Sequence, residues 1–152
     1  MPELRRSAAP RGFTLIELLI VVLIIGVLAT LIVPRYRQSV LKSQGADVIA
    51  RIEAINVGVK LYETDRDTVP TGTGTPGVAP AWLVPYLTGN HFYGPGDVTF
   101  QFVKTSTSTH PTLVIAAGSA QENQILLAAA GSLGPIATTI GGGQSIIVQL
   151  TE

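Results

Sequence analysis

The chain has 152 residues, enough for one small domain together with a membrane anchor. Its ten basic and ten acidic side chains cancel, and charged residues make up 13% of the sequence, against a usual share of about 25%. So sparse a charge argues against nucleic-acid binding, and the absence of cysteine excludes disulfides, thiol catalysis and cysteine-based metal sites.

A long apolar run begins after three arginines, Arg5, Arg6 and Arg11, and extends from Phe13 to Val33. Its 21 residues are all large and apolar or alanine, except Thr14, Glu17, Gly26 and Thr30. As a helix the run would be about 31 Å long, enough to cross the hydrocarbon core of a bilayer. The arginines favour an N-terminus in the cytoplasm and translocation of the remainder.

The apolar run opens with a specific combination of residues, in which Gly12 is followed by the aromatic Phe13 and, four positions later, by Glu17. The surrounding sequence RGFTLIEL resembles the processing motif of type IV pilins and the related pseudopilins. The resemblance implies that a prepilin peptidase cuts between Gly12 and Phe13 and methylates the new amine of Phe13. It also implies a role for Glu17 in filament assembly. The similarity is close as far as Pro34, weaker to Tyr62, and limited to the general layout beyond.

Two other interpretations of the N-terminal region remain open, a secretory signal peptide and a signal anchor that is never cut. A signal peptide has an apolar segment of about 7–15 residues and a cleavage site of small residues. The present run is longer, and no convincing site of that kind follows it. We therefore expect residues 1–12 to be a leader and residues 13–34 to form the transmembrane and filament-core half of a helix.

Glu17 needs a partner because an ionised carboxylate in an apolar environment is costly. After a cut behind Gly12, the charged amine of Phe13 would lie four residues away on the same helix face. Glu17 could pair with this amine in its own chain or in a neighbouring subunit. The resemblance implies the neighbour, and such a pair would set the axial register of a filament. Gly26 and Pro34 interrupt the helix, and we expect a kink there. The resemblance implies that this part of the helix can loosen on assembly.

Residues 35–65 are predicted to form the amphipathic half of the same helix. Apolar residues recur there mainly every three or four positions, at Leu41, Val48, Ile49, Ile52, Ile55, Val59 and Tyr62. This spacing places them in one stripe that a sheet can cover. Gly45 and Gly58 each lower helix propensity by about 1 kcal/mol relative to alanine, so tertiary packing must support this half.

Residues 66–152 are predicted to form a globular domain. Pro80–Leu87 is expected to form a short helical turn whose Trp82, Leu83 and Leu87 pack on the domain. Short β-rich or apolar runs predict strands at Val98–Val103, Thr112–Ala117, Gln124–Ala129 and Ser145–Leu150. Gln124–Ala129 suits a helix equally well, and Gly131–Gly143 reads as a glycine-rich loop. The fold class is therefore α+β, a long N-terminal helix on an antiparallel sheet of about 3–4 strands, as in pilins.

No catalytic constellation emerges from the sequence. His91 and His110 have no acidic cluster near them, so we expect no enzyme, metal site or cofactor. Major pseudopilins often bind calcium in a C-terminal loop, but residues 128–150 contain no Asp or Glu. The Ser/Thr-rich segment 105–109 is expected to be an exposed loop and a candidate for glycosylation.

The sequence thus predicts a structural subunit of a type IV pilus-like filament. It would insert in the inner membrane with its N-terminus in the cytoplasm, and then enter a surface pilus or a periplasmic pseudopilus. Its expected partners are other copies and related pilins, the prepilin peptidase, an inner-membrane assembly platform and, before assembly, the lipid bilayer. The alternatives are a pseudopilin of a type II secretion system and a minor pilin acting as a membrane-tethered adhesion or binding module.

Overall fold

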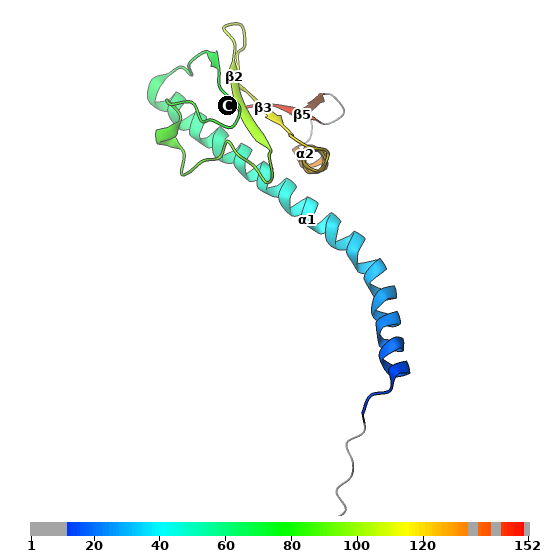
Figure 1. Cartoon of the computed structure of the whole chain (residues 1–152). Helices are drawn as coiled ribbons and strands as arrows, with labels where there is room; N and C mark the ends of the chain where they lie inside the picture. Colours follow the sequence, from blue (N-terminus) through cyan, green and yellow to red (C-terminus); the bar gives the residue numbers. More distant parts are fainter. Residues whose placement is uncertain (1–11, 134–136, 141–143, 151–152) are drawn as a thin grey trace, which may run out of the picture. The chain divides into compact units, whose positions relative to one another are not determined.

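The computed structural model describes residues 12–133, 137–140 and 144–150. The chain divides into two compact units, residues 1–38 and residues 39–152. Helix α1 (Leu15–Arg66) supplies the regular structure of the first unit and the first element of the second (Figure 1).

In the first unit, every residue from Gly12 to Gln38 is exposed. Among the described residues, α1 is the one helix long and apolar enough to cross a membrane, with a mean hydropathy of 3.1 over its most apolar window. The hydroxyl of Thr30 donates to the carbonyl of Val27 at 2.7 Å, which satisfies this polar group within the apolar run. The helix continues through Gly26 and Pro34, and the kink expected there stays a prediction.

The second unit contains a five-stranded antiparallel sheet of order β1-β2-β3-β5-β4. Its strands are β1 (Gly72–Thr73), β2 (Thr99–Lys104), β3 (Thr112–Ala116), β4 (Ala137–Ile140) and β5 (Ser145–Gln149). Alternate residues of the three central strands are buried. They form two cross-strand rows, Phe100–Ile115–Ile146 and Phe102–Leu113–Val148. The register thus presents one apolar face of the sheet, as period-2 alternation requires.

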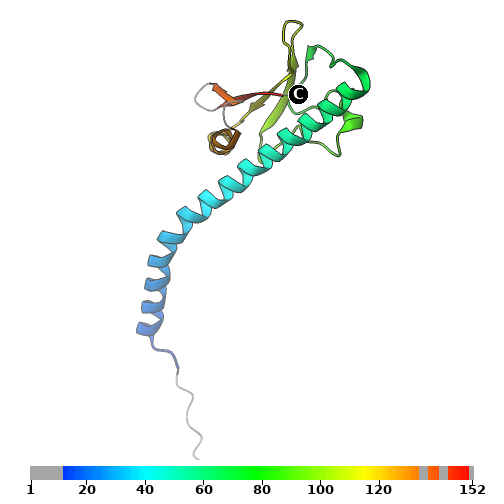
Figure 2. The same ribbon diagram turned by 180° about the vertical axis from the view of Figure 1, so that it is seen from behind.

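Residues 39–66 of α1 pack on this apolar face (Figures 1 and 2). The predicted stripe is confirmed at Val48, Ile52, Ile55 and Val59, which are all buried in the core that also holds the two rows of sheet residues. The α+β, pilin-like fold class is therefore confirmed, with a sheet of five strands when the two-residue β1 is counted.

Two sequence predictions in the C-terminal part are wrong. Gln124–Ala129 lies in helix α2 (Ala120–Leu133) rather than in a strand. Buried Ile125, Leu126 and Ala129 follow helical spacing, and the side chain of Ser119 accepts a hydrogen bond from the Glu122 backbone at the helix start. The second wrong prediction is the loop at Gly131–Gly143. Its residues 131–133 belong to α2 and its residues 137–140 form β4. Residues 134–136 and 141–143 lie outside the described part. The turn expected near residues 80–87 is confirmed as a 3-10 helix at Val84–Tyr86.

The two glycines in the second half of α1 are packing positions. A β-carbon on Gly45 would lie 3.2 Å from the backbone nitrogen of Ala129 and 3.3 Å from the β-carbon of Ala128, both in α2. A β-carbon on Gly58 would lie 2.9 Å from a methyl group of Leu87. The helix therefore has glycine where α2 and the segment after residue 80 approach its backbone.

An aromatic cluster joins the end of α1 to the segment that follows it. The ring of Tyr62 lies 4.6 Å from that of Trp82 and 5.5 Å from that of Tyr86, and Trp82 lies 5.2 Å from Phe102. The Tyr86 hydroxyl donates to the Asp65 carboxylate at 2.8 Å. As predicted, Leu83 is fully buried, and Trp82 and Leu87 pack against the core. In a chain without cysteine, this cluster fastens the segment after α1 without a covalent link.

Candidate functional site

The N-terminus of α1 is closed by Thr14 and Glu17. Oε2 of Glu17 accepts hydrogen bonds from the backbone nitrogen and the hydroxyl of Thr14, both at 3.0 Å. The backbone nitrogen of Glu17 donates in return to the Thr14 hydroxyl at 3.3 Å. With Thr14 directly before the first helical residue, this is a capping box, which satisfies amide groups that the first helical turn leaves unpaired.

The predicted cleavage pair lies just ahead of this cap. Gly12 and Phe13 are exposed and precede the helix, and 85% of the Phe13 surface is accessible. Because neither residue lies in the helix, a peptidase would not have to unwind α1 to reach the bond between them. The capping box begins at Thr14 and includes neither of them, so a cut between Gly12 and Phe13 would leave it in place.

The apolar residues behind the cap form one continuous exposed surface. Large side chains from Leu15 to Val33 have between 47% and 82% of their surface accessible. Soluble monomers rarely expose an apolar patch of more than a few hundred Å². A surface of this kind suits contact with lipid or with other apolar helices. The exposed cations Arg35 and Arg37 follow Pro34 and suit the polar boundary of a membrane.

The predicted site residues thus fall into two groups. Gly12 and Phe13 precede α1, and Glu17 lies in its first turn with its side chain bonded to Thr14. Gly26 and Pro34 lie further along the helix, and nothing comes within 4 Å of a β-carbon built on Gly26. Sequence reasoning missed the role of Thr14, although the spacing Thr14-x-x-Glu17 before an apolar run is a recognisable capping signal.

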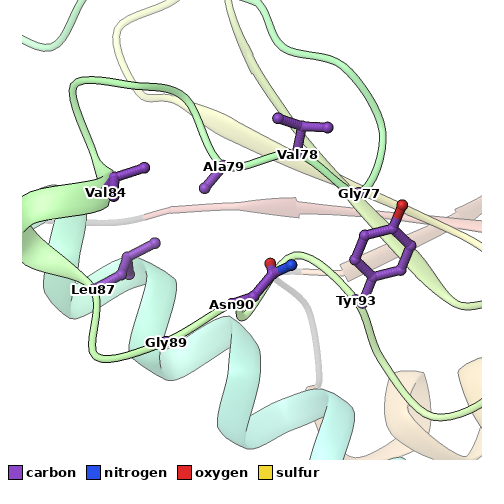
Figure 3. Close-up of a pocket in the computed structure, with 8 residues that line it drawn as sticks. All are labelled: Gly77, Val78, Ala79, Val84, Leu87, Gly89, Asn90 and Tyr93. Carbon is purple, nitrogen blue, oxygen red and sulfur yellow. The ribbon is translucent and has the colours of Figure 1, made fainter.

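A second feature is an apolar pocket of about 490 Å³ in the second unit (Figure 3). Figure 3 shows Val78, Ala79 and Val84 on one side and Leu87 and Asn90 on the other, with Tyr93 at one end. Gly77 has φ +76°, and a β-carbon there would lie 2.6 Å from the Tyr93 ring. Among its described lining residues, none carries a charge.

Metal ligands do not gather in the described part of the chain, where no group of three His, Asp or Glu residues was found. The carboxylate of Glu122 instead makes hydrogen bonds with neighbouring groups of the protein. Its Oε1 accepts a hydrogen bond from the backbone of Asp97 at 3.2 Å. Hydrogen bonding with the side chain of Ser119, and then with the Asp97 amide, lowers the pKa of the Glu122 carboxyl.

Comparison with known proteins finds a family motif and sequence relatives. The family described as "Prokaryotic N-terminal methylation motif" matches residues 8–33. The type II secretion system core protein G of Escherichia coli (strain K12) is 33% identical over 89 residues, which are 58% of this chain and 61% of that protein. Fimbrial protein EcpC of Eikenella corrodens is 36% identical over 69 residues, 45% of each chain. The chain therefore spans 45% to 61% of the length of these relatives.

The major type IV pilin PilA1 from Clostridium difficile has a similar fold. Its structure superposes with a TM-score of 0.53 and covers 75% of this chain and 98% of the pilin, at 14% sequence identity. At this identity the likeness concerns the fold. The covered share, 75% of this chain, is larger than the part that matches the N-terminal methylation motif.

Proposed function

We propose that the chain is a member of the type IV pilin and type II secretion pseudopilin family and a structural subunit of a type IV pilus-like filament, and its N-terminal motif, its sequence relatives and its fold support this. The observation that carries the proposal is the position of Phe13 and Glu17 at the head of an exposed apolar helix. Such a helix can leave the bilayer only for another apolar environment, and copies of the same helix provide one.

The first step of the proposal is removal of residues 1–12 by a prepilin peptidase and methylation of Phe13. The accessible Gly12–Phe13 bond and the match of the methylation motif to residues 8–33 support it. Removal of the leader takes away Arg5, Arg6, Arg11 and Glu3, so ten basic and ten acidic side chains become seven and nine, a net of −2. The new amine, on the cytoplasmic side, adds a positive charge at neutral pH.

The second step is assembly, with Glu17 setting the register. The capping box engages Oε2 and does not require Oε1. A carboxylate can accept several hydrogen bonds, so Glu17 can hold its own helix start and bind the Phe13 amine of a neighbour together. In a water-poor filament core, an unpaired amine and an unpaired carboxylate would each be costly. The favoured axial register between subunits is then the one in which the Phe13 amine of one subunit meets the Glu17 carboxylate of its neighbour. An inner-membrane assembly platform would deliver each subunit to the growing filament.

A periplasmic pseudopilus is the alternative that a specific observation favours, namely the 33% identity to core protein G. A minor pilin that acts as a tethered binding module would share the motif but enter filaments rarely. A pilus subunit, a pseudopilin and a minor pilin differ in where the processed chain accumulates.

The test is to shear the cell surface, separate filaments from membranes, and measure the mass of the N-terminal peptide in each fraction. N-methylated Phe13 in sheared filaments is the expected result for a pilus subunit. Methylated Phe13 in membranes alone would favour the pseudopilin or a rare minor subunit. A chain that still starts at Met1, or that is cut elsewhere, would overturn the proposal.

A further inference from the structure

The turn between β2 and β3 contains a run of hydroxyl residues to which the proposed function gives no role, Thr105-Ser106-Thr107-Ser108-Thr109. Segments rich in serine and threonine together with proline are typical carriers of O-linked sugars, and Pro111 follows this run. The sequence has no Asn-x-Ser/Thr acceptor for an N-linked sugar. The composition therefore points to an O-linked modification, and the geometry of the turn distinguishes the hydroxyls.

The hairpin presents this run on a fixed base. Val103 of β2 pairs with Thr112 of β3 where the turn begins and ends. The carbonyl of Pro111 accepts a hydrogen bond from the backbone nitrogen of Leu150 at 3.0 Å, which ties the end of the turn to the residue after β5. Figures 1 and 2 show the tip of the hairpin projecting beyond the rest of the second unit. An enzyme can therefore reach the tip without displacing any part of the core.

Ser106 has the free hydroxyl at this tip. The backbone nitrogen of Ser108 donates to the carbonyl of Thr105 at 3.2 Å, which closes a four-residue turn with Ser106 and Thr107 at its centre. The hydroxyls of Thr105 and Thr107 bond to each other at 3.4 Å, and the hydroxyl of Ser108 donates to the carbonyl of His110 at 3.2 Å. Ser106 is exposed, and its hydroxyl makes no hydrogen bond within the described part of the chain.

Thr109 is the other residue of the run whose hydroxyl is not bonded to a described residue, and its surroundings are tighter. It lines a narrow cleft of about 10 Å³ together with Asn56, Lys60 and Glu63 of α1. A glycosyltransferase has to place a bulky sugar donor directly over the acceptor hydroxyl. The tip leaves room for such a donor at Ser106, whereas α1 restricts the approach to Thr109.

We propose that Ser106 is the acceptor of an O-linked glycan. In the transfer step, Oγ of Ser106 forms a bond with the anomeric carbon of a sugar that is carried by a diphosphate. The bond between that carbon and the donor phosphate breaks, and the diphosphate leaves with the electron pair. A base of the glycosyltransferase takes the hydroxyl proton. The inference goes beyond the proposed filament function and requires only that the second unit meets the transferase.

A glycan suits the surface of this chain, which carries few charges. After removal of the leader, seven basic and nine acidic side chains would remain, so charge repulsion between molecules is weak. Large apolar side chains of the second unit, such as Val84 and Leu127, are exposed. A sugar is bulky and solubilising, and on a projecting tip it would hold second units of separate molecules apart without adding charge.

The test is the intact mass of the full chain, purified from the membranes and the sheared filaments of its native cells. The expected result is a mass above that of the unmodified chain by whole sugar units, which fragmentation by electron transfer assigns to Ser106. Ser106→Ala is expected to lose the added mass, and Ser106→Thr is expected to keep it because threonine supplies the same hydroxyl. The matched control is Thr88→Ala, which removes an exposed hydroxyl after the 3-10 helix and should keep the added mass.

The outcomes separate this inference from the proposed function. An unmodified chain, a phosphate on Ser106, or a sugar on another residue alone would overturn the inference. Chains with methylated Phe13 in filaments but no sugar would do so while leaving the proposed function intact. A chain that carries the sugar on Ser106 and still starts at Met1 would support the inference and overturn the proposed function.

Discussion

The carboxylate of Glu17 and the hydroxyl of Thr14 hold each other at 3.0 Å, and this pair begins the longest helix of the chain. Glu17 is therefore part of the helix start as well as a candidate for charge pairing between subunits. The two roles rest on different chemistry, because capping needs an oxygen acceptor while pairing with an amine needs a negative charge.

Glu17→Gln separates the two roles. Glutamine serves in a capping box as glutamate does, but it has no charge with which to pair the Phe13 amine. We expect E17Q to insert and be processed normally, and to lower filament yield at least about tenfold, a factor equivalent to 1.4 kcal/mol. The measurement is sheared filament protein per amount of processed membrane protein. Glu17→Ala is the companion variant, which loses both roles. Wild-type filaments from E17Q would mean that capping alone accounts for Glu17.

Thr14→Val tests the other half of the pair. Valine removes the hydroxyl and with it two of the three hydrogen bonds, leaving the bond from the backbone nitrogen of residue 14. Loss of a capping side chain costs about 1 kcal/mol of helix stability. We expect faster amide exchange in the first helical turn of the processed chain in detergent micelles.

Thr30→Val provides the control for this measurement, because the Thr30 hydroxyl also bonds within the apolar run but to a carbonyl in mid-helix. It should leave exchange in the first turn unchanged. Equal exchange rates in the two variants would contradict a capping role for Thr14.

The capping signal also explains what the sequence could have predicted. Thr14-x-x-Glu17 and Ser119-x-x-Glu122 follow the same pattern, and each marks the start of a helix. The second instance would have identified α2, where the short leucine and alanine run Gln124–Ala129 is ambiguous by itself. The capping pattern was recognisable in the sequence, whereas the apolar composition of Gln124–Ala129 alone could not distinguish a helix from a strand.

Other features depend on contacts between distant residues. The helical stripe containing Val48 and Val59 was predictable, because period 3.6 is local. Gly45 and Gly58 were read as weak points of the helix, since nothing near them in the sequence indicates what packs there. The pocket beside Val84 likewise requires Gly77 and Tyr93 to meet across 16 positions. Such features come from tertiary structure.

Gly45→Ala is expected to destabilise the second unit, although alanine normally stabilises a helix relative to glycine by about 1 kcal/mol. The added methyl would press on the backbone of Ala129, which cannot move without shifting α2. Overpacking of this kind costs about 1–3 kcal/mol. Gly58→Ala is the matched variant, and we expect a smaller effect because it meets a flexible methyl of Leu87. Urea unfolding of the full chain in detergent measures both. A more stable G45A protein would contradict the close approach of α2.

Tyr86 should titrate late. Its hydrogen bond to the Asp65 carboxylate raises the pKa of the phenol above its usual value near 10, because ionisation would remove the donated proton and set two negative charges side by side. A pKa raised in the folded state adds stability that is fully present below the unfolded pKa and is lost as pH rises through the folded one. The contact therefore contributes at neutral pH and weakens only in strong alkali. Absorbance titration of the full chain in detergent should show a late tyrosine step that disappears in Tyr86→Phe and moves to lower pH in Asp65→Asn. A late step that persists unchanged in Asp65→Asn would show that Asp65 is not its cause.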